Sequence, residues 1–368
     1  MKCIDRKHGQ GKLAEQNEQA HFTKQTQFTK FAKMRLVHGN PVKKYILLLL
    51  TFIVIGSLAL AIKPIRKVVM KCSIRLLECV QNRVIDETPN IAYDQLSIRT
   101  VEGKRDEIAY DVITREKDAI YSGDLILVNS DHIYQFTQQD QLLPLKTYKN
   151  HAYKIMTEDM YLSKKMLTAL NLMMNDFEDV TDKHDMIITS AYRSLSEQQE
   201  AFEEKVAEYG IEEAPKWAMA PGYSEHHIGY AADMSIYTDD EIYVAYEGQD
   251  EYAWINQNCF KYGIVRRYTE DKTEITGISN EPWHYRYVGI PHAYLMVIQN
   301  MCLEEYIDYI RKFSYEDKHL RLTVAEGCYE IYYVAASEDG TSFIPVPKNL
   351  PYTISGNNVD GFIITITL

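Results

Sequence analysis

Two short segments of the chain hold residues that can bind a metal ion and activate a water molecule. The first contains His226 and Asp233, and the second contains Glu281 and His284. Two imidazoles and one carboxylate leave an open coordination position on zinc, which is typical of a catalytic rather than a structural site. Glu281, three residues before His284, is then a candidate general base for a metal-activated water. These residue types predict metal-assisted hydrolysis.

The spacing in the first segment predicts a tight loop that leads into a strand. Asp233 follows His226 by seven positions, too far for one helical turn to carry both. Gly229 and the small Ala231 between them allow a close approach of backbone and metal. His227 is a neighbouring imidazole, and the spacing alone leaves it open as an alternative ligand to His226.

The second segment predicts a strand. Glu281 precedes a proline, which biases it toward an extended conformation. In a strand that starts at Trp283, the side chains of His284 and Arg286 share one face, while Trp283 and Tyr285 lie on the other. A metal site built from both segments therefore joins two separate elements.

Charge and cysteine content narrow the possible functions. Residues 1–44 hold ten Lys/Arg and three Asp/Glu, so this part carries a net charge of +7 and the rest of the chain −19. An acidic globular part argues against nucleic acid as a partner. The six cysteines form no CxxC pair, so neither a zinc–thiolate site nor a disulfide framework is indicated.

The N-terminal part of the chain predicts a membrane anchor. Residues 1–44 form a basic, polar tail, and residues 45–63 contain a run of 17 uncharged residues from Ile46 to Ile62. At about 1.5 Å per residue this run reaches roughly 26 Å, close to a hydrocarbon core of about 30 Å. A cleaved signal peptide and a buried soluble helix are the alternatives. Basic residues flank both ends, so the orientation with the N-terminus inside is favoured only weakly.

The remaining chain divides into a stalk and linker (64–119), a central domain (120–315) and a β-rich appendage (316–368). Periodicity predicts helices over 161–177, 252–262 and 291–313, and another that starts at a Ser196 cap with Gln199 in a capping box and stops at Gly210. Strands are predicted over 124–128, 132–136, 186–192, 264–265 and 283–288, and in the appendage over 320–324, 329–334, 343–346 and 362–368.

Three motifs together resemble the VanY-type D-alanyl-D-alanine carboxypeptidases, zinc D,D-peptidases of peptidase family M15. These are the Ser-x-His-x-x-Gly-x-Ala-x-Asp pattern ending in Asp233, the Glu-x-Trp-His pattern ending in His284, and the run from Ser190 to Ser194 with Gln198. The resemblance covers roughly residues 120–313. It implies an α+β fold: a hedgehog/D,D-peptidase-like zinc domain with a small antiparallel sheet flanked by helices, here preceded by one transmembrane helix and followed by the β appendage.

The resemblance also implies a role for each site residue. His226, Asp233 and His284 would hold Zn²⁺, and the register of the motif selects His226 over His227. Glu281 would take a proton from the water and pass it to the leaving amine. Arg193 would stabilise the oxyanion, as a fixed guanidinium can. Ser190 and Gln198 would contact the substrate peptide, with strand-end and helix-cap hydrogen bonding as the alternative.

The implied substrate is the D-Ala-D-Ala end of the peptidoglycan stem peptide, in lipid-linked precursor or nascent wall, from which the last D-Ala is removed. This substrate lies outside the cytoplasm, so we expect a single-pass protein of the cell membrane with a cytoplasmic N-terminus and an extracellular catalytic domain. A role in wall remodelling or glycopeptide resistance would follow. The alternatives are an L,D-carboxypeptidase, a D,D-dipeptidase or a wall endopeptidase of the same fold, or a non-catalytic zinc-bearing wall-binding module.

Overall fold

A computed structural model describes residues 96–103, 107–136, 141–238 and 240–368. They belong to one compact unit of the chain. In the described part of the chain no helix is both long and apolar enough to cross a membrane. The predicted tail (1–44) and transmembrane helix (45–63) lie outside the described residues.

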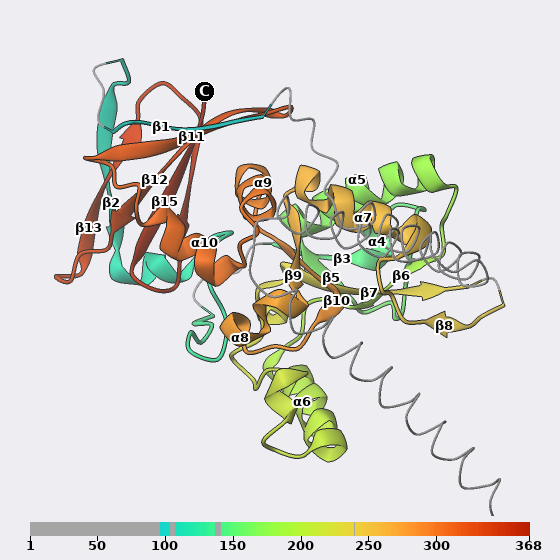
Figure 1. Cartoon of the computed structure of the whole chain (residues 1–368). Helices are drawn as coiled ribbons and strands as arrows, with labels where there is room; N and C mark the ends of the chain where they lie inside the picture. Colours follow the sequence, from blue (N-terminus) through green and yellow to red (C-terminus); the bar gives the residue numbers. More distant parts are fainter. Residues whose placement is uncertain (1–95, 104–106, 137–140, 239) are drawn as a thin grey trace, which may run out of the picture. The chain divides into compact units, whose positions relative to one another are not determined.

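The central sheet has the order β4-β6-β7-β10-β9, with β8 added beside β7 (Figure 1). Its pairs are antiparallel except for β4 and β6, which run parallel. The predicted small antiparallel sheet is thus a mixed one. The strands are β4 (Lys154–Ile155), β6 (Met186–Ser190), β7 (Ala231–Tyr237), β8 (Tyr243–Val244), β9 (Ile264–Tyr268) and β10 (Glu281–Tyr287).

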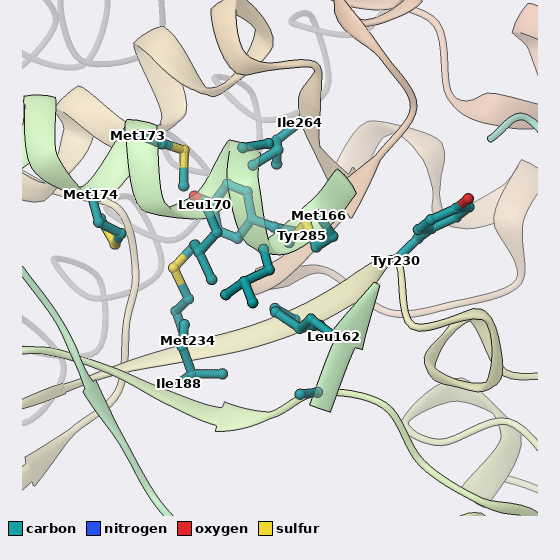
Figure 2. Packing of buried hydrophobic residues seen from close by; sticks show 14 of the residues in the cluster. Leu162, Met166, Leu170, Met173, Met174, Ile188, Tyr230, Met234, Ile264 and Tyr285 are labelled. Carbon is teal, nitrogen blue, oxygen red and sulfur yellow. The ribbon is translucent and has the colours of Figure 1, made fainter. Parts of the chain in front are cut away.

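Helix α5 (Lys164–Thr181) covers one face of this sheet. It begins at Ser163, whose hydroxyl accepts a hydrogen bond from the backbone N–H of Met166, and ends at Asp182 in a left-handed conformation. Figure 2 shows Met166 and Leu170 of the helix packed against Met234 and Tyr285 of the strands. Since side chains alternate along a strand, the residues next to Met234 and Tyr285, namely Asp233 and His284, point to the opposite face.

The other helices and short strands complete the central part. The predicted helix over 161–177 starts later, because residues 161–163 form β5. The predicted helix over 291–313 is two helices. The elements are β3 (Leu142–Pro144), β5 (Tyr161–Ser163), α4 (Leu145–Tyr148), α6 (Leu195–Tyr209), α7 (Ala253–Asn258), α8 (Thr273–Thr276), α9 (Ile290–Ile298) and α10 (Leu303–Ile310).

A second sheet, with the order β1-β11-β12-β15-β14, forms the β unit together with the β2–β13 ladder (Figure 1). The β runs predicted in the appendage are present, and β14 was not predicted. The strands are β1 (Ser97–Glu102), β2 (Tyr110–Glu116), β11 (Lys318–Val324), β12 (Gly327–Ala335), β13 (Thr341–Pro347), β14 (Tyr352–Gly356) and β15 (Gly361–Thr367).

The β unit takes two strands from the predicted linker (64–119). β1 pairs with β11 and β2 pairs with β13, both antiparallel. Most of their side chains are exposed, so their sequences lack the apolar alternation by which strands are recognised. Residues 97–102 and 110–116 are therefore part of the β unit rather than a linker.

The predicted strands at 124–128 and 132–136 are wrong. Asp124 and Leu125 lie in a turn and residues 126–128 belong to no strand, although residues 125–128 are buried. The N–H of Leu127 donates to the Asn357 carbonyl, in a loop of the β unit, over 3.0 Å. Leu125 and Leu127 join a core that also contains Phe260, Leu303 and Ile331. Residues 125–128 are hydrophobic because they are buried at the junction with the β unit, and not because they form part of a sheet.

Candidate metal centre

The first motif folds as a short 3-10 helix, a glycine turn and a strand. The helix spans Glu225–Ile228, and the Ser224 hydroxyl caps it by accepting from the backbone N–H of His226 over 3.3 Å. Gly229 has φ +75°. This left-handed conformation favours glycine, and a Cβ there would also lie 3.2 Å from the backbone nitrogen of Ser163, a tight contact. The turn delivers the chain into β7, where Asp233 lies on the sheet face away from α5.

Strand β10 brings the second motif to the same place. It runs antiparallel to β7 with His284 directly opposite Asp233. Their side chains meet, with the Nδ1 of His284 2.9 Å from Oδ1 of Asp233. The Nε2 of His226 lies 3.4 Å from Oδ2 of the same carboxylate. One ligand atom from each of the three residues falls within 4.8 Å of the others.

His226 is held in a way that leaves one nitrogen free for a ligand. Its Nδ1–H donates to the Ala191 carbonyl over 2.6 Å, which fixes the tautomer with the lone pair on Nε2. That Nε2 atom is buried and has no hydrogen-bond partner among the described residues. A buried, unsatisfied acceptor is costly unless something binds it. Together with the adjacent Asp233 and His284, it fits a bound metal ion.

His227 is excluded as a ligand by its own contacts. Its Nδ1 donates to the Arg193 carbonyl over 2.7 Å, and its Nε2 accepts from the N–H of Gly222 over 3.0 Å. Both ring nitrogens are thus used by the protein. The structure brings His226, and not His227, to Asp233 and His284.

Glu281 lies at the edge of this cluster, with Oε2 3.8 Å from Nδ1 of His284. Burial raises the pKa of Glu281 to about 8, an effect strengthened by the neighbouring Asp233 carboxylate and opposed by His284 and Arg193. A carboxyl group whose pKa lies near neutrality can accept and then return a proton during a reaction. Its position and chemistry suit the general base that the sequence predicts.

Arg193 reaches the same site from the segment after β6. Burial lowers the pKa of its guanidinium, while the carboxylates of Asp233 and Glu281 oppose that effect. Its Nε is buried without a hydrogen-bond partner in the described part of the chain. A cation beside the carboxylates with an uncommitted donor can serve an anionic ligand or a developing oxyanion.

Comparison with known proteins identifies the family. The family model for VanY, D-alanyl-D-alanine carboxypeptidase, matches residues 159–290. A D-alanyl-D-alanine carboxypeptidase of Enterococcus faecium is 37% identical over 256 residues, which cover 69% of this chain and 78% of that enzyme. The chain belongs to the VanY family of D-alanyl-D-alanine carboxypeptidases. The predicted resemblance is confirmed, and so is the prediction of a zinc metallo-hydrolase with D,D-carboxypeptidase activity.

Solved structures agree with this assignment for the fold. The vancomycin resistance D,D-dipeptidase VanXYg, solved with a D-Ala-D-Ala phosphinate analogue, is 32% identical to this VanY-family chain and has a TM-score of 0.63. The match covers 71% of this chain and all of VanXYg. A VanY mutant from the VanB-type resistance cassette, solved in complex with Zn(II), is 34% identical and covers 50% of this chain and 98% of its own, with a TM-score of 0.40. The match to VanXYg, at a TM-score of 0.63, shows that the predicted D,D-peptidase-like fold is present.

The two residues predicted to bind substrate in this VanY-family chain are placed differently from one another. Ser190 ends β6 opposite Asp233 and is half-buried, so it borders the cluster. Gln198 is fully buried in α6, where its Nε2 donates to the Met219 carbonyl over 2.6 Å. Gln198 therefore holds the segment around Met219, which precedes the first motif, against helix α6. Helix α6 is capped by Ser194 with Glu197 in the capping box, so the predicted Ser196–Gln199 box is wrong.

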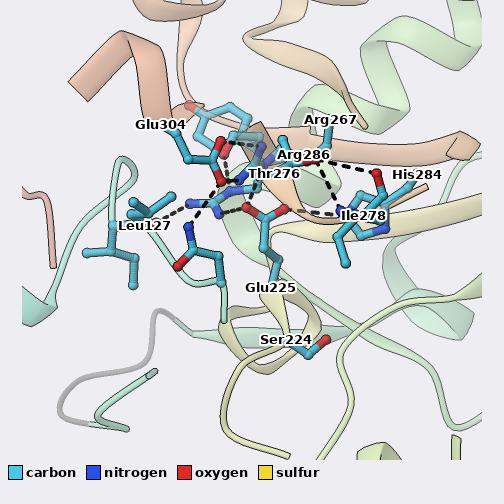
Figure 3. Close-up of polar contacts among 12 residues, drawn as sticks. Leu127, Ser224, Glu225, Arg267, Thr276, Ile278, His284, Arg286 and Glu304 are labelled. Carbon is cyan, nitrogen blue, oxygen red and sulfur yellow. Dashed lines mark hydrogen bonds and ion pairs between the residues drawn. The ribbon is translucent and has the colours of Figure 1, made fainter. Parts of the chain in front are cut away.

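Glu225 is a further residue at this centre that sequence reasoning missed. Its side chain is fully buried and lies between His284, Arg267 and Arg286, as Figure 3 shows. Burial alone would raise the pKa of Glu225, but the two guanidinium groups outweigh it and hold that pKa well below its usual range. The only signal in the sequence was its position inside the first motif, immediately before His226.

Proposed function

We propose that the protein is a membrane-anchored zinc D,D-carboxypeptidase that removes the C-terminal D-Ala from peptidoglycan stem pentapeptides. The observation that carries this proposal is the cluster of His226, Asp233 and His284, in which a buried Nε2 of His226 lacks a partner, with Glu281 beside it. Three N/O ligands match the protein contribution to catalytic zinc sites.

The residues of the site divide the work of peptide hydrolysis. Zinc, when bound, lowers the pKa of water and polarises a carbonyl oxygen. Glu281 accepts the proton from the attacking water and delivers it to the amine of the leaving D-Ala. Arg193 places its guanidinium against the negative charge that develops on the scissile carbonyl oxygen. Its burial makes that electrostatic stabilisation larger than it would be in water.

The substrate is proposed from the family and from the relatives. The Enterococcus faecium relative is a D-alanyl-D-alanine carboxypeptidase, and VanXYg was solved with a D-Ala-D-Ala phosphinate analogue. A peptide ending in D-Ala-D-Ala is therefore the substrate class that we propose for this chain. The alternatives within the same fold differ in the length and stereochemistry of the peptide end, so a substrate series separates them.

The test is an assay of released D-alanine from three substrates by the full-length protein in detergent. We expect release from the stem pentapeptide, and little hydrolysis of the tetrapeptide or of free D-Ala-D-Ala. Preferred cleavage of the tetrapeptide would show an L,D-carboxypeptidase, and preferred cleavage of the free dipeptide a dipeptidase. Zinc binding without hydrolysis of any of these peptides, or of cross-linked wall, would show a binding module.

Membrane anchoring rests on the uncharged run from Ile46 to Ile62. We propose that residues 45–63 span the membrane once, with the basic tail in the cytoplasm and the catalytic domain outside, where the wall substrate is. Protease added to intact spheroplasts should digest the catalytic domain and spare an epitope fused to the N-terminus. A soluble protein, or a catalytic domain protected from the protease, would contradict this arrangement.

A further inference from the structure

The buried carboxylate of Glu225 makes two kinds of contact through its two oxygens. Oε1 accepts hydrogen bonds from Nε of Arg267 over 2.8 Å and from Nη1 of Arg286 over 2.9 Å. Oε2 lies 3.4 Å from Nε2 of His284. The side chains of Glu225 and both arginines are fully buried. One carboxylate thus joins a two-arginine clamp to a ligand histidine of the metal centre (Figure 3).

The two nitrogens of His284 face opposite partners. Nε2 faces Glu225, while Nδ1 lies 2.9 Å from Asp233 Oδ1 and 3.8 Å from Glu281 Oε2. A carboxylate paired with two guanidinium groups can only accept hydrogen bonds. The Nε2 of His284 must therefore carry the proton toward Glu225, and Nδ1 is the nitrogen that can offer a lone pair to a metal.

The clamp holds Glu225 in place from two directions. Nη1 and Nη2 of Arg267 donate to both carboxylate oxygens of Glu304 on α10, over 2.9 and 2.7 Å. Nη2 of Arg286 donates to the backbone carbonyls of Asp124 and Ile126, over 2.9 and 3.2 Å. Arginine forks of this kind fix both the position and the angle of their partner. Glu225 cannot move without breaking buried, charged hydrogen bonds.

We propose that Glu225 is a positioning residue of the metal centre. It fixes the ring of His284 in the tautomer with the proton on Nε2, so that Nδ1 faces Asp233, and the clamp of Arg267 and Arg286 makes that orientation rigid. This inference rests on the metal site of the proposed function. A carboxylate that accepts the second N–H of a ligand histidine typically contributes 10- to 100-fold to metal affinity.

The Glu225→Gln variant tests the proposal against a matched Glu304→Gln control. An amide has one donor and one acceptor end, so at position 225 it presents its NH₂ either to the arginines or to the Nε2–H of His284. Glu304→Gln removes the same charge from Arg267 but does not touch His284.

Zinc affinity of the full-length protein, measured by competition with a chromophoric chelator, should fall about 10- to 100-fold for Glu225→Gln. It should stay near that of the unsubstituted protein for Glu304→Gln.

The outcomes separate this inference from the proposed function. Failure of the unsubstituted protein to bind zinc would overturn both. If Glu225→Gln bound zinc as tightly as the unsubstituted protein, or if both variants lost affinity equally, only the positioning role would be overturned.

A second measurement needs no variant, which matters if Glu225→Gln does not fold. Nitrogen-15 NMR of the histidine rings in the zinc-loaded, unsubstituted protein should show a protonated, hydrogen-bonded Nε2 on His284. A proton on Nδ1 of His284, with Nε2 bound to zinc, would overturn the proposal.

Discussion

In the described part of the chain, a histidine of the central sheet and a histidine of the β unit each contact a buried glutamate, and the two pairs have different roles. In the central sheet His284 pairs with Glu225, and in the β unit His319 pairs with Glu330 over 2.7 Å. Arginine supports the carboxylate in both pairs: Arg267 and Arg286 in the first, Arg321 in the second. The ring of His319 also stacks on Tyr332, with 4.3 Å between ring centroids.

The difference is in the second nitrogen of each ring. His319 uses it within the fold, since its Nε2 donates to the Tyr315 carbonyl over 3.0 Å. The Nδ1 of His284 instead faces Asp233, close to an Nε2 of His226 that has no partner in the described part of the chain. Buried histidine–carboxylate pairing is therefore compatible with a purely structural role. The metal site is instead distinguished by ligand atoms that lie close together and that no other group of the fold binds.

Substituting each histidine in turn should show the largest difference between the two pairs. We expect His284→Ala to lose zinc and reduce D-alanine release to background, because a ligand is gone. We expect His319→Ala to keep zinc and activity but to lose about 1–3 kcal/mol of unfolding free energy, because Glu330 loses a buried hydrogen-bond partner. Metal analysis after gel filtration and urea unfolding measure the two effects. Zinc loss in His319→Ala would contradict the distinction.

Glu281→Gln should separate catalysis from metal binding within the site. The amide cannot accept the proton of the attacking water, so kcat should fall by about 10²- to 10⁴-fold. The three ligands are untouched, and the zinc content should stay at that of the unsubstituted protein. Steady-state D-alanine release and metal analysis on one preparation give both values. Full activity in this variant would exclude Glu281 as the base.

Arg193→Ala should give a somewhat smaller loss. Removing one group that stabilises an oxyanion typically costs about 10²- to 10³-fold in kcat. Because that group acts on charge that appears only in the transition state, the loss should be in kcat more than in KM. Steady-state kinetics on the pentapeptide decide this, and a change confined to KM would assign Arg193 to substrate binding instead.

The last prediction concerns His292, a buried histidine outside both pairs. His292 bonds Tyr306 and Thr365, and burial lowers its pKa to about 3 from an ordinary value near 6.5. The unfolded chain then binds one more proton than the folded protein between these two pH values. The unfolding free energy is therefore unaffected by His292 above pH 6.5. Between the two pKa values it falls by about 1.4 kcal/mol for each unit by which the pH decreases.

The difference in unfolding free energy between the unsubstituted protein and a His292→Gln variant, followed from pH 7 to pH 4, measures that slope. A difference that does not change with pH would show that His292 is already protonated in the folded protein.

The sequence was most informative where chemistry restricts the choice of residues. The cluster of His226, Asp233 and His284, with Glu281 beside it, was predicted because hydrolytic metal sites use these residue types, and the choice of His226 over His227 came from the family resemblance. The shared face of His284 and Arg286 in β10 was predicted from strand alternation, whereas the pairing of β10 with β7 was not. The C-terminal strands β11, β12, β13 and β15 could be predicted from short β-like runs between turns, whereas β14 was not.

The remaining features depend on tertiary contacts that have no local pattern. β1 and β2 are mostly exposed strands, recognised only through their partners in the β unit. The run at 125–128 is apolar because it is buried at the junction with the β unit. In sequence, a buried apolar run of this kind resembles a strand. Glu225 could not be assigned a role because its partners Arg267 and Arg286 lie about 40 and 60 positions away.

The most direct test of the central claim is zinc titration into the metal-stripped, full-length protein, with D-alanine release from the stem pentapeptide as the readout. We expect chelation to abolish release and activity to return in proportion to added zinc, reaching its full value at one zinc per chain. Undiminished release from the stripped protein, or a zinc-loaded protein that leaves the pentapeptide intact, would contradict it.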